Sequence, residues 1–186
     1  METVYLKDRV PPHNDEAEKA TIGALLLDSE ALSTVLRYLR PEDFYRTAHK
    51  KIFQAIIDLF QKGEVIDLIT LTNELRVKGE LESCGGLAYA SSLTSEVPTS
   101  ANVEYYARIV QGSSVRRLLI KISHGIIANA YDDSLESRTI IEEAEKDIFE
   151  VTDRQQSGNF KTAGEVVART IEAIEKRYHA KDNYTG

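Results

Sequence analysis

The chain has 186 residues, of which 42% are hydrophobic and 28% charged; its net charge is −7 and it has one cysteine. This composition is typical of a soluble globular protein with one core, and it excludes an internal disulfide. No apolar run approaches the roughly 20 residues of a membrane-spanning helix, and the charged first residues are unlike a secretion signal. The negative net charge also does not suit binding to the phosphates of duplex DNA. We therefore expect a cytoplasmic protein whose partners are other proteins.

The first predicted helix follows a pair of prolines at residues 11–12. Because proline cannot donate a backbone hydrogen bond and disfavours helix in the residue before it, residues 1–10 are predicted to form an extended arm. Asp15 and Glu18 have the spacing of a capping box, and Asn14 is an equally suitable cap. The helix is therefore predicted to begin directly after the prolines.

Apolar residues at helical spacing continue beyond this first helix. Gly23, inside it, has no side chain and would let a neighbouring helix approach closely. Pro41 can open a turn or the first position of the second helix, Gly63 can end that helix, and Asp67 can cap the third. The helices after the first are predicted over residues 41–63, 67–79 and 87–94. Residues 11–100 are therefore predicted to form a compact helical bundle.

Residues 101–156 are predicted to form a long helical hairpin. A proline-free helical run is followed by residues 132–134, which have turn composition, and apolar positions then return at helical spacing. Asp133 and Glu136 have capping-box spacing and are predicted to start the returning helix. One face of the first hairpin helix carries a predicted core stripe of Val115, Leu118, Leu119, Ile122 and Ile126.

A second apolar stripe lies on the same helix, roughly 120° around its axis from the first. It consists of Ile109, Ile120, Ile127 and Tyr131. A hairpin by itself buries one stripe of each helix, so this second stripe either contacts another chain or packs on the preceding bundle. Both interpretations follow from the pattern.

The end of the chain is predicted to be a separate helix. Residues 157–161 have linker composition, and Thr162 and Glu165 form a further capping box at the start of a helix within residues 162–186. Its apolar stripe consists of Ile171, Ile174 and Tyr178. We expect this stripe to dock on a neighbouring subunit, because an isolated helix of this length is only marginally stable in water. The last residues are predicted to start a connection to a further domain.

No arrangement of residues points to catalysis. The sequence has no P-loop glycine motif for a triphosphate, and its four histidines are dispersed rather than paired at metal-ligand spacing. Arg116 and Arg117 could contact a carboxylate or a phosphate, although a surface salt bridge is the simpler interpretation. We therefore predict no catalytic residue, cofactor or metal in this chain; an unrecognised carboxylate site in the bundle is the enzyme alternative.

Five segments, in their order and spacing, resemble a known family. They are PPHNDEAEKATIGALLL, DFYRTAHKKIFQAI, VIDLITLTNEL, LESCGGLAYASSL and VPTSANVEYYARIV. Together they are similar to the amino-terminal domain, with its linker helix, of bacterial and phage DnaB-type replicative DNA helicases. The resemblance extends over nearly the whole chain and implies an all-α fold, a helical bundle followed by a helical hairpin.

The resemblance also implies a function. Domains of this family pair through their hairpins and assemble as a trimer of dimers, which forms the collar of a hexameric ring around single-stranded DNA. The implied partners are further copies of the chain, primase and a helicase loader. In the family a RecA-like motor domain follows the linker helix and uses ATP and magnesium to unwind duplex DNA in the 5′ to 3′ direction. We expect this chain to be the non-enzymatic amino-terminal part of such a helicase; the alternative is a stand-alone helical adaptor or regulatory scaffold without a motor.

Five residues are candidates for the interface with a second subunit or with primase. Four form the second stripe of the hairpin. The fifth follows the flexible Gly85 and Gly86 and could anchor a partner, or pack in the core. The candidates are Ile109, Ile120, Ile127, Tyr131 and Tyr89.

Overall fold

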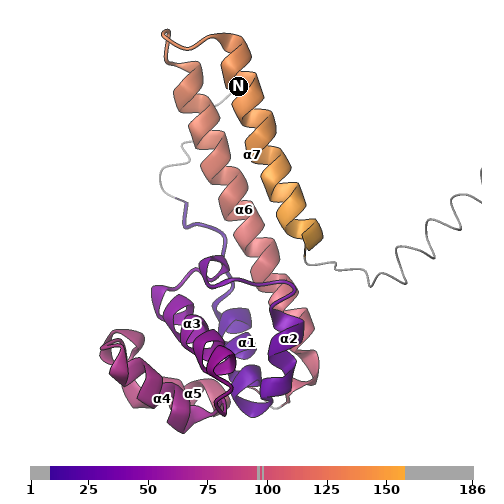
Figure 1. Cartoon of the computed structure of the whole chain (residues 1–186). Coiled ribbons are helices and arrows are strands. Elements are labelled where there is room, and N and C mark those ends of the chain that lie inside the picture. The colour runs from indigo at the N-terminus through magenta and orange to yellow at the C-terminus, as the bar shows by residue number, and fades with distance from the viewer. Residues whose placement is uncertain (1–8, 96, 98, 158–186) are drawn as a thin grey trace, which may run out of the picture.

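The computed structural model describes residues 9–95, 97 and 99–157, and every regular element among them is helical. The α-helices are α1 (Asp15–Leu27), α2 (Leu32–Val35), α3 (Thr47–Lys62), α4 (Leu68–Val77), α5 (Gly86–Ser95), α6 (Val103–Ala130) and α7 (Ser137–Ser157). α1 to α5 gather in a body at one end of the molecule, while α6 extends away from it and α7 returns beside α6 (Figure 1). The predicted all-α architecture of a bundle followed by a long hairpin is confirmed.

Two predicted segments lie outside the described residues. One is the extended arm, of which only residues 9 and 10 are described. The other begins with the predicted linker of residues 157–161, of which only Ser157 is described, as the last residue of α7, and continues with the helix within residues 162–186 and its docking residues Ile171, Ile174 and Tyr178. Both therefore stay predictions.

The core of the body is built around α1. Ile22 and Leu25 of α1 are fully buried, and the rings of Phe44 and Phe53 pack with their centroids 4.9 Å apart. Gly23 lies where α1 meets α5, because a Cβ atom placed on it would be 2.1 Å from the carbonyl oxygen of Leu93. The predicted close approach of a neighbouring helix is confirmed, and α5 is that neighbour.

Local capping residues set several helix ends. Asn14 caps α1, because its side chain accepts a hydrogen bond from the N–H of Ala17 at 2.9 Å. Gly63, with a φ of 69°, ends α3 in the left-handed conformation. The side chain of Asp67 accepts from the N–H of Thr70 at 2.8 Å and starts α4. These predicted ends are confirmed.

At two places in the body the structure decides between predicted alternatives. Glu18 does not complete a capping box on α1; it is buried, and its carboxylate binds the start of α3 instead. Pro41 opens a turn, the first of its two predicted roles: the short 3-10 helix Pro41–Asp43 ends because Phe44 adopts an extended conformation, so Pro41 does not begin α3. α3 begins at Thr47.

The turn between α6 and α7 also differs from the prediction. α7 begins at Ser137, so Asp133 lies too early to cap it and the predicted capping box with Glu136 is wrong. The neighbouring Asp132 closes the turn, because its side chain accepts a hydrogen bond from the N–H of Ser134 at 3.0 Å.

α6 runs from the body into the arm without a break, and polar contacts fix it where it leaves. Its first half contributes to the core the buried side chains of Val103, Ala107 and Val110. Arg117 donates to the carbonyl oxygens of Pro12, at 2.7 Å, and of Asp43. Ser114 donates to the Asp43 carboxylate at 2.7 Å. The interpretation of Arg117 as a surface salt bridge is therefore wrong, because its guanidinium joins α6 to two backbone segments of the body.

A second anchor lies nearer the start of α6. The hydroxyl of Tyr38 donates to Glu104 at 2.7 Å, and Arg108 donates to the same carboxylate oxygen at 2.7 Å. These two hydrogen bonds lower the pKa of Glu104. The guanidinium of Arg108 also lies 5.1 Å from the centre of the Tyr38 ring.

Although α6 has 28 residues, neither it nor another helix in the described ranges has an apolar stretch that could cross a lipid bilayer.

Candidate partner-binding surface and a buried polar cluster

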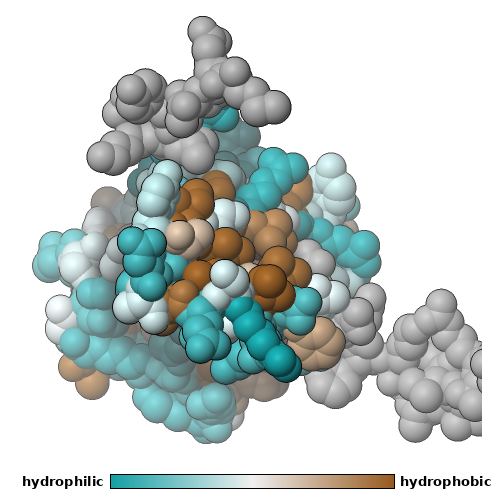
Figure 2. All heavy atoms as spheres, turned by 90° about the horizontal axis from the view of Figure 1, so that it is seen from above, coloured by the Kyte–Doolittle hydropathy of each residue, from teal (hydrophilic) through white to brown (hydrophobic). Residues whose placement is uncertain are grey.

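The arm, formed by the outer part of α6 and by α7, carries exposed apolar side chains on both helices. Ile120 and Ile127 of α6 are 43% and 49% exposed, and Tyr131, which directly follows α6, is 85% exposed. Seen from above, from the end of the molecule that carries the arm, hydrophobic side chains gather near the centre with hydrophilic ones around them (Figure 2). We define the arm surface as the exposed residues Leu119, Ile120, Ile127, Tyr131, Ile141, Ile148 and Phe149.

The arm surface is exposed because two helices cover only part of each other. Of the predicted core stripe, Ile122 is buried, but Leu119 is 42% exposed and its assignment to the core is wrong. On α7, Val151 is buried while Ile141 and Ile148 remain about half exposed. Each helix in a hairpin faces one neighbour, so apolar residues away from that contact stay in water. Within the residues that the structure describes, the arm therefore presents more apolar surface than its two helices cover.

Ile109 differs from the other members of the predicted second stripe. It is partly buried and packs against the core of the body. It also lines an open pocket of about 440 Å³ between α1 and α6, whose other residues are Asn14, Glu16, Ala17, Ala20, Val97 and Tyr106. Ile109 thus packs on the preceding bundle, which was one of the two interpretations of the second stripe. The other members of the stripe, Ile120, Ile127 and Tyr131, lie on the arm surface.

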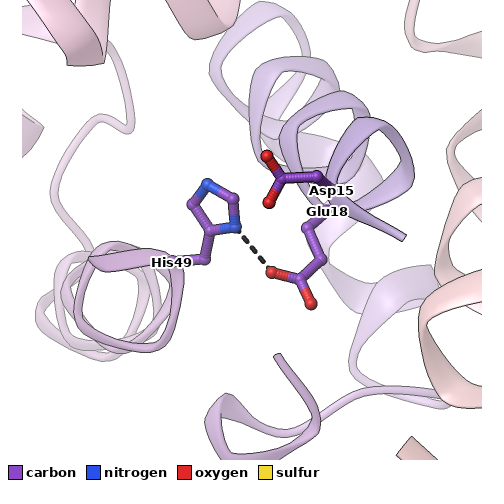
Figure 3. A group of neighbouring side chains, drawn as sticks. All are labelled: Asp15, Glu18 and His49. Atoms are coloured by element: carbon purple, nitrogen blue, oxygen red, sulfur yellow. Dashed lines mark hydrogen bonds and ion pairs between the residues drawn. The ribbon is translucent and has the colours of Figure 1, made fainter. Parts of the chain in front are cut away.

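The fold brings together a polar cluster that the sequence analysis missed. Glu18 of α1 is 1% exposed and His49 of α3 is fully buried. Figure 3 shows the two side chains pointing toward each other, with Asp15 beside them. The Nδ1 atom of His49 lies 2.6 Å from a carboxylate oxygen of Glu18. The sequence did contain a signal for this cluster: Glu18 and His49 lie on the same helix faces as apolar residues such as Ile22 and Ile52, which are buried.

Glu18 acts as a cap supplied by a different helix. One of its carboxylate oxygens accepts a hydrogen bond from the N–H of Tyr45 at 2.6 Å, and the other accepts from the N–H of Arg46 at 3.4 Å. These backbone groups precede the first turn of α3, where a negative charge is favourable. The same carboxylate orients His49, so a single acidic side chain joins α1 to the start of α3.

The other members of the cluster are also engaged. Nε2 of His49 lies 2.6 Å from the hydroxyl of Tyr89 on α5, and Asp15 accepts a hydrogen bond from the guanidinium of Arg46. The hydrogen bond to Asp15 raises the pKa of Arg46. Tyr89, a predicted interface residue, is therefore partly buried and tied to the body rather than to the arm.

Asp15, Glu18 and His49 present ligand atoms that all lie within 4.8 Å of one another, close enough to share a cation. Each of these side chains already has a hydrogen-bond or ion-pair partner within the protein. Hydrogen bonding therefore accounts for the cluster as a structural joint between three helices.

The described fold is a helical body that fixes a long arm, and the arm carries exposed apolar side chains. The family model of DnaB-like helicase N-terminal domains matches residues 10–112. The chain belongs to this family.

Individual relatives agree with this assignment. The chain is 43% identical over 179 residues to the replicative DNA helicase DnaB of Geobacillus stearothermophilus, an alignment that covers 96% of this chain and 39% of that protein. The crystal structure of the N-terminal domain of DnaB helicase from Mycobacterium tuberculosis has a TM-score of 0.71 and 36% identity, and it covers 75% of this chain and 99% of that one. A DnaB-like replicative helicase whose structure was determined with its interactions with primase has a TM-score of 0.62 and 26% identity, covering 86% of this chain and 35% of that one. The chain thus spans about two-fifths of the length of the curated helicases that it matches.

Proposed function

We propose that this chain is the collar domain of a replicative DNA helicase, which organises the ring by association of its arms and docks primase. The observation that carries this proposal is the arm surface, which leaves Ile120 and Ile127 of α6, and Tyr131 directly after it, exposed on an arm that hydrogen bonds fix to the body. Contiguous exposed apolar side chains on a soluble domain mark surfaces that other proteins cover. The helicase relatives identify the class of assembly in which such a surface is used.

The arm surface is assigned first to a second copy of the chain. In a two-fold dimer each residue contributes twice, so Ile120 and Ile127 supply four side chains to the contact. Fully burying an isoleucine is worth about 1.5–3 kcal/mol, and these side chains are already half covered, so each contributes about 1 kcal/mol. Together they supply about 4 kcal/mol, which is roughly a thousandfold in the dissociation constant.

Primase is the second proposed partner. A relative with 26% identity was studied for its interactions with primase. The candidate contacts outside the arm surface are Tyr89 on α5 and Ile109 on α6, which are both partly buried against the core of the body. A helicase loader and single-stranded DNA inside the ring complete the proposed set of partners. In the intact protein, a motor domain after Ile171, Ile174 and Tyr178 would bind ATP and magnesium and unwind DNA in the cytoplasm, with these three residues docked on a neighbouring subunit.

The test replaces Ile120 and Ile127 together with Asp and measures mass by sedimentation equilibrium over a concentration series. Ile69→Asp is the matched control, because Ile69 is 78% exposed on α4 in the body, away from the arm. We expect the paired arm variant to keep its circular dichroism and to dimerise roughly a thousandfold more weakly, while the control matches the parent.

Binding to the primase of Geobacillus stearothermophilus is measured on the same proteins. Loss of dimers and of primase binding would assign the arm surface to both partners, and loss of one alone would assign it to that partner. A paired arm variant that retains parental mass and parental primase affinity would refute the proposal.

A further inference from the structure

The arm carries a groove on the side that faces away from Ile120 and Ile127. This arm groove has a volume of about 370 Å³ and is lined by Leu118, Lys121, Ile122 and Gly125 of α6 and by Asp147 and Glu150 of α7. Gly125 precedes Ile127 by two residues, so the two positions lie about 160° apart around the helix axis. Pairing of two chains through Ile120 and Ile127 therefore leaves the arm groove open.

The arm groove has an apolar floor and a negatively charged rim. A Cβ atom on Gly125 would have no neighbour within 4 Å, so no contact within the described residues requires a glycine at this helical position. Asp147 and Glu150 are exposed, and neither carboxylate has a hydrogen bond or ion pair in the described part of the chain. Two carboxylates and the ammonium of Lys121 line the groove, which leaves a surplus of negative charge. Such a groove suits a long cationic side chain, whose methylene groups can lie on the floor while its charged end meets the carboxylates.

The body, at the other end of the molecule (Figure 1), carries a patch of the opposite charge. The guanidinium groups of Arg37 and Arg108 lie 5.8 Å and 5.1 Å from the centre of the Tyr38 ring. Arg108 pairs with Glu104 at 2.7 Å. Arg37 is exposed, and its guanidinium has no hydrogen bond or ion pair with another described residue. The Tyr38 patch, formed by these four residues, therefore has a surplus of positive charge and offers the N–H donors of Arg37 to a partner.

The Tyr38 patch is fixed in place before any partner binds. The hydroxyl of Tyr38 donates to Glu104 at 2.7 Å, and its carbonyl oxygen accepts a hydrogen bond from the side-chain amide of Gln111 at 3.0 Å. Both ends of the residue are thus tied to α6. An arginine that lies over a fixed ring loses less freedom on association than one on a mobile loop.

The arm groove and the Tyr38 patch of one chain are too far apart to meet each other. Lys121 lies roughly 20 Å along α6 from Arg108, at about 1.5 Å per residue. A contact between the two surfaces therefore joins different chains. Because the surfaces are unlike, this contact can extend to further copies and close a ring, whereas a two-fold contact between arms stops at two chains.

We propose that Arg37 of one copy enters the arm groove of a copy in the neighbouring dimer, where its guanidinium pairs with Asp147 and Glu150. The contact joins dimers into the ring, so this inference rests on the function proposed above. It assigns the second contact that a ring of paired arms requires.

The test is charge reversal with rescue, measured by sedimentation equilibrium of the 186-residue chain up to millimolar concentration. Arg37→Glu and Glu150→Arg should each weaken the association of dimers by at least about tenfold, because each substitution places like charges in the contact. The two combined should return to within about threefold of the parent, since the charges are again opposite. A combined variant that associates no better than the single ones, or a parent that stays dimeric at millimolar concentration, would overturn the proposal.

Two controls separate a local contact from an effect of net charge. Arg76→Glu and Glu145→Arg change the net charge by the same amounts at exposed positions on α4 and α7, outside both surfaces. We expect parental association from both, and weakening equal to that of the groove variants would refute the specific pair.

The dimerisation constant distinguishes this inference from the proposed function. The charge variants should leave it unchanged, whereas Ile120→Asp combined with Ile127→Asp should weaken it. Association that responds to the charge pair but not to the isoleucines would reject pairing of the arms and retain the groove contact. Dimers that respond only to the isoleucines would do the reverse.

Discussion

Glu18→Ala tests the joint between α1 and α3 most directly. The substitution removes the acceptor of the N–H of Tyr45 at 2.6 Å and the partner of His49 at 2.6 Å, together with the longer contact to the N–H of Arg46. Leaving a buried donor unsatisfied costs about 1–3 kcal/mol. Because the substitution removes two close contacts and one weaker contact, we expect the free energy of unfolding to fall by about 3–5 kcal/mol. A typical domain has a free energy of unfolding of about 5–15 kcal/mol, so this is a large part of the total.

The assay is urea unfolding followed by far-ultraviolet circular dichroism, and Glu16→Ala is the control. Glu16 lies in the same turn of α1 but is exposed, so its removal should change stability by less than about 0.5 kcal/mol. Glu18→Gln, which keeps one carbonyl acceptor for the N–H of Tyr45, should lose less than the alanine variant. If Glu18→Ala stays within about 1 kcal/mol of the parent, the carboxylate does not hold the two helices together as described.

Two further predictions concern packing and pH. Gly23→Ala should destabilise the body by about 1–3 kcal/mol, because its Cβ would lie 2.1 Å from the carbonyl oxygen of Leu93. Gly125→Ala on α6 has open space around the new Cβ and should stabilise the protein by up to about 1 kcal/mol. Thermal unfolding of both variants checks this, and equal effects on stability would contradict it. The hydrogen bond from Lys62 lowers the pKa of Glu74, so the stability that this pair contributes is present above the ordinary pKa of a glutamate and is lost as the pH falls through the lowered value. Lys62→Met should therefore flatten the loss of stability on acidification in urea titrations at several pH values, and an unchanged pH profile would count against the pair.

The features that the sequence predicted well depend on neighbouring residues. Asn14, Gly63 and Asp67 act on the backbone within three or four positions of themselves, so their roles could be inferred from spacing. The hairpin was predictable for the same reason, since periodic apolar positions and a turn define it without tertiary information. Gly23 indicated a close helix contact, but only the structure identifies α5 as the helix.

The features that were missed or misassigned depend on distant residues. Glu18 has the spacing of a capping-box residue, yet its partners Tyr45 and His49 lie 27 and 31 residues away. Leu119 has the periodicity of a core residue, and what decides its exposure is how far α7 wraps around α6. The role of Arg117 likewise required knowledge that Pro12 and Asp43 meet at one point. The site could be predicted as a set of apolar stripes, but its limits could not.

The unbroken course of α6 has a mechanical consequence. Residues 118–130 continue the helix beyond the contacts of Arg117, and at about 1.5 Å per residue they extend roughly 20 Å. A stiff rod of that length fixed at its base is a lever, so turning the body by roughly 10° displaces the far end by roughly 3–4 Å. A rotation of the body would therefore shift the far end of α6 by about the width of a methyl group, so the arm amplifies small rotations of the body.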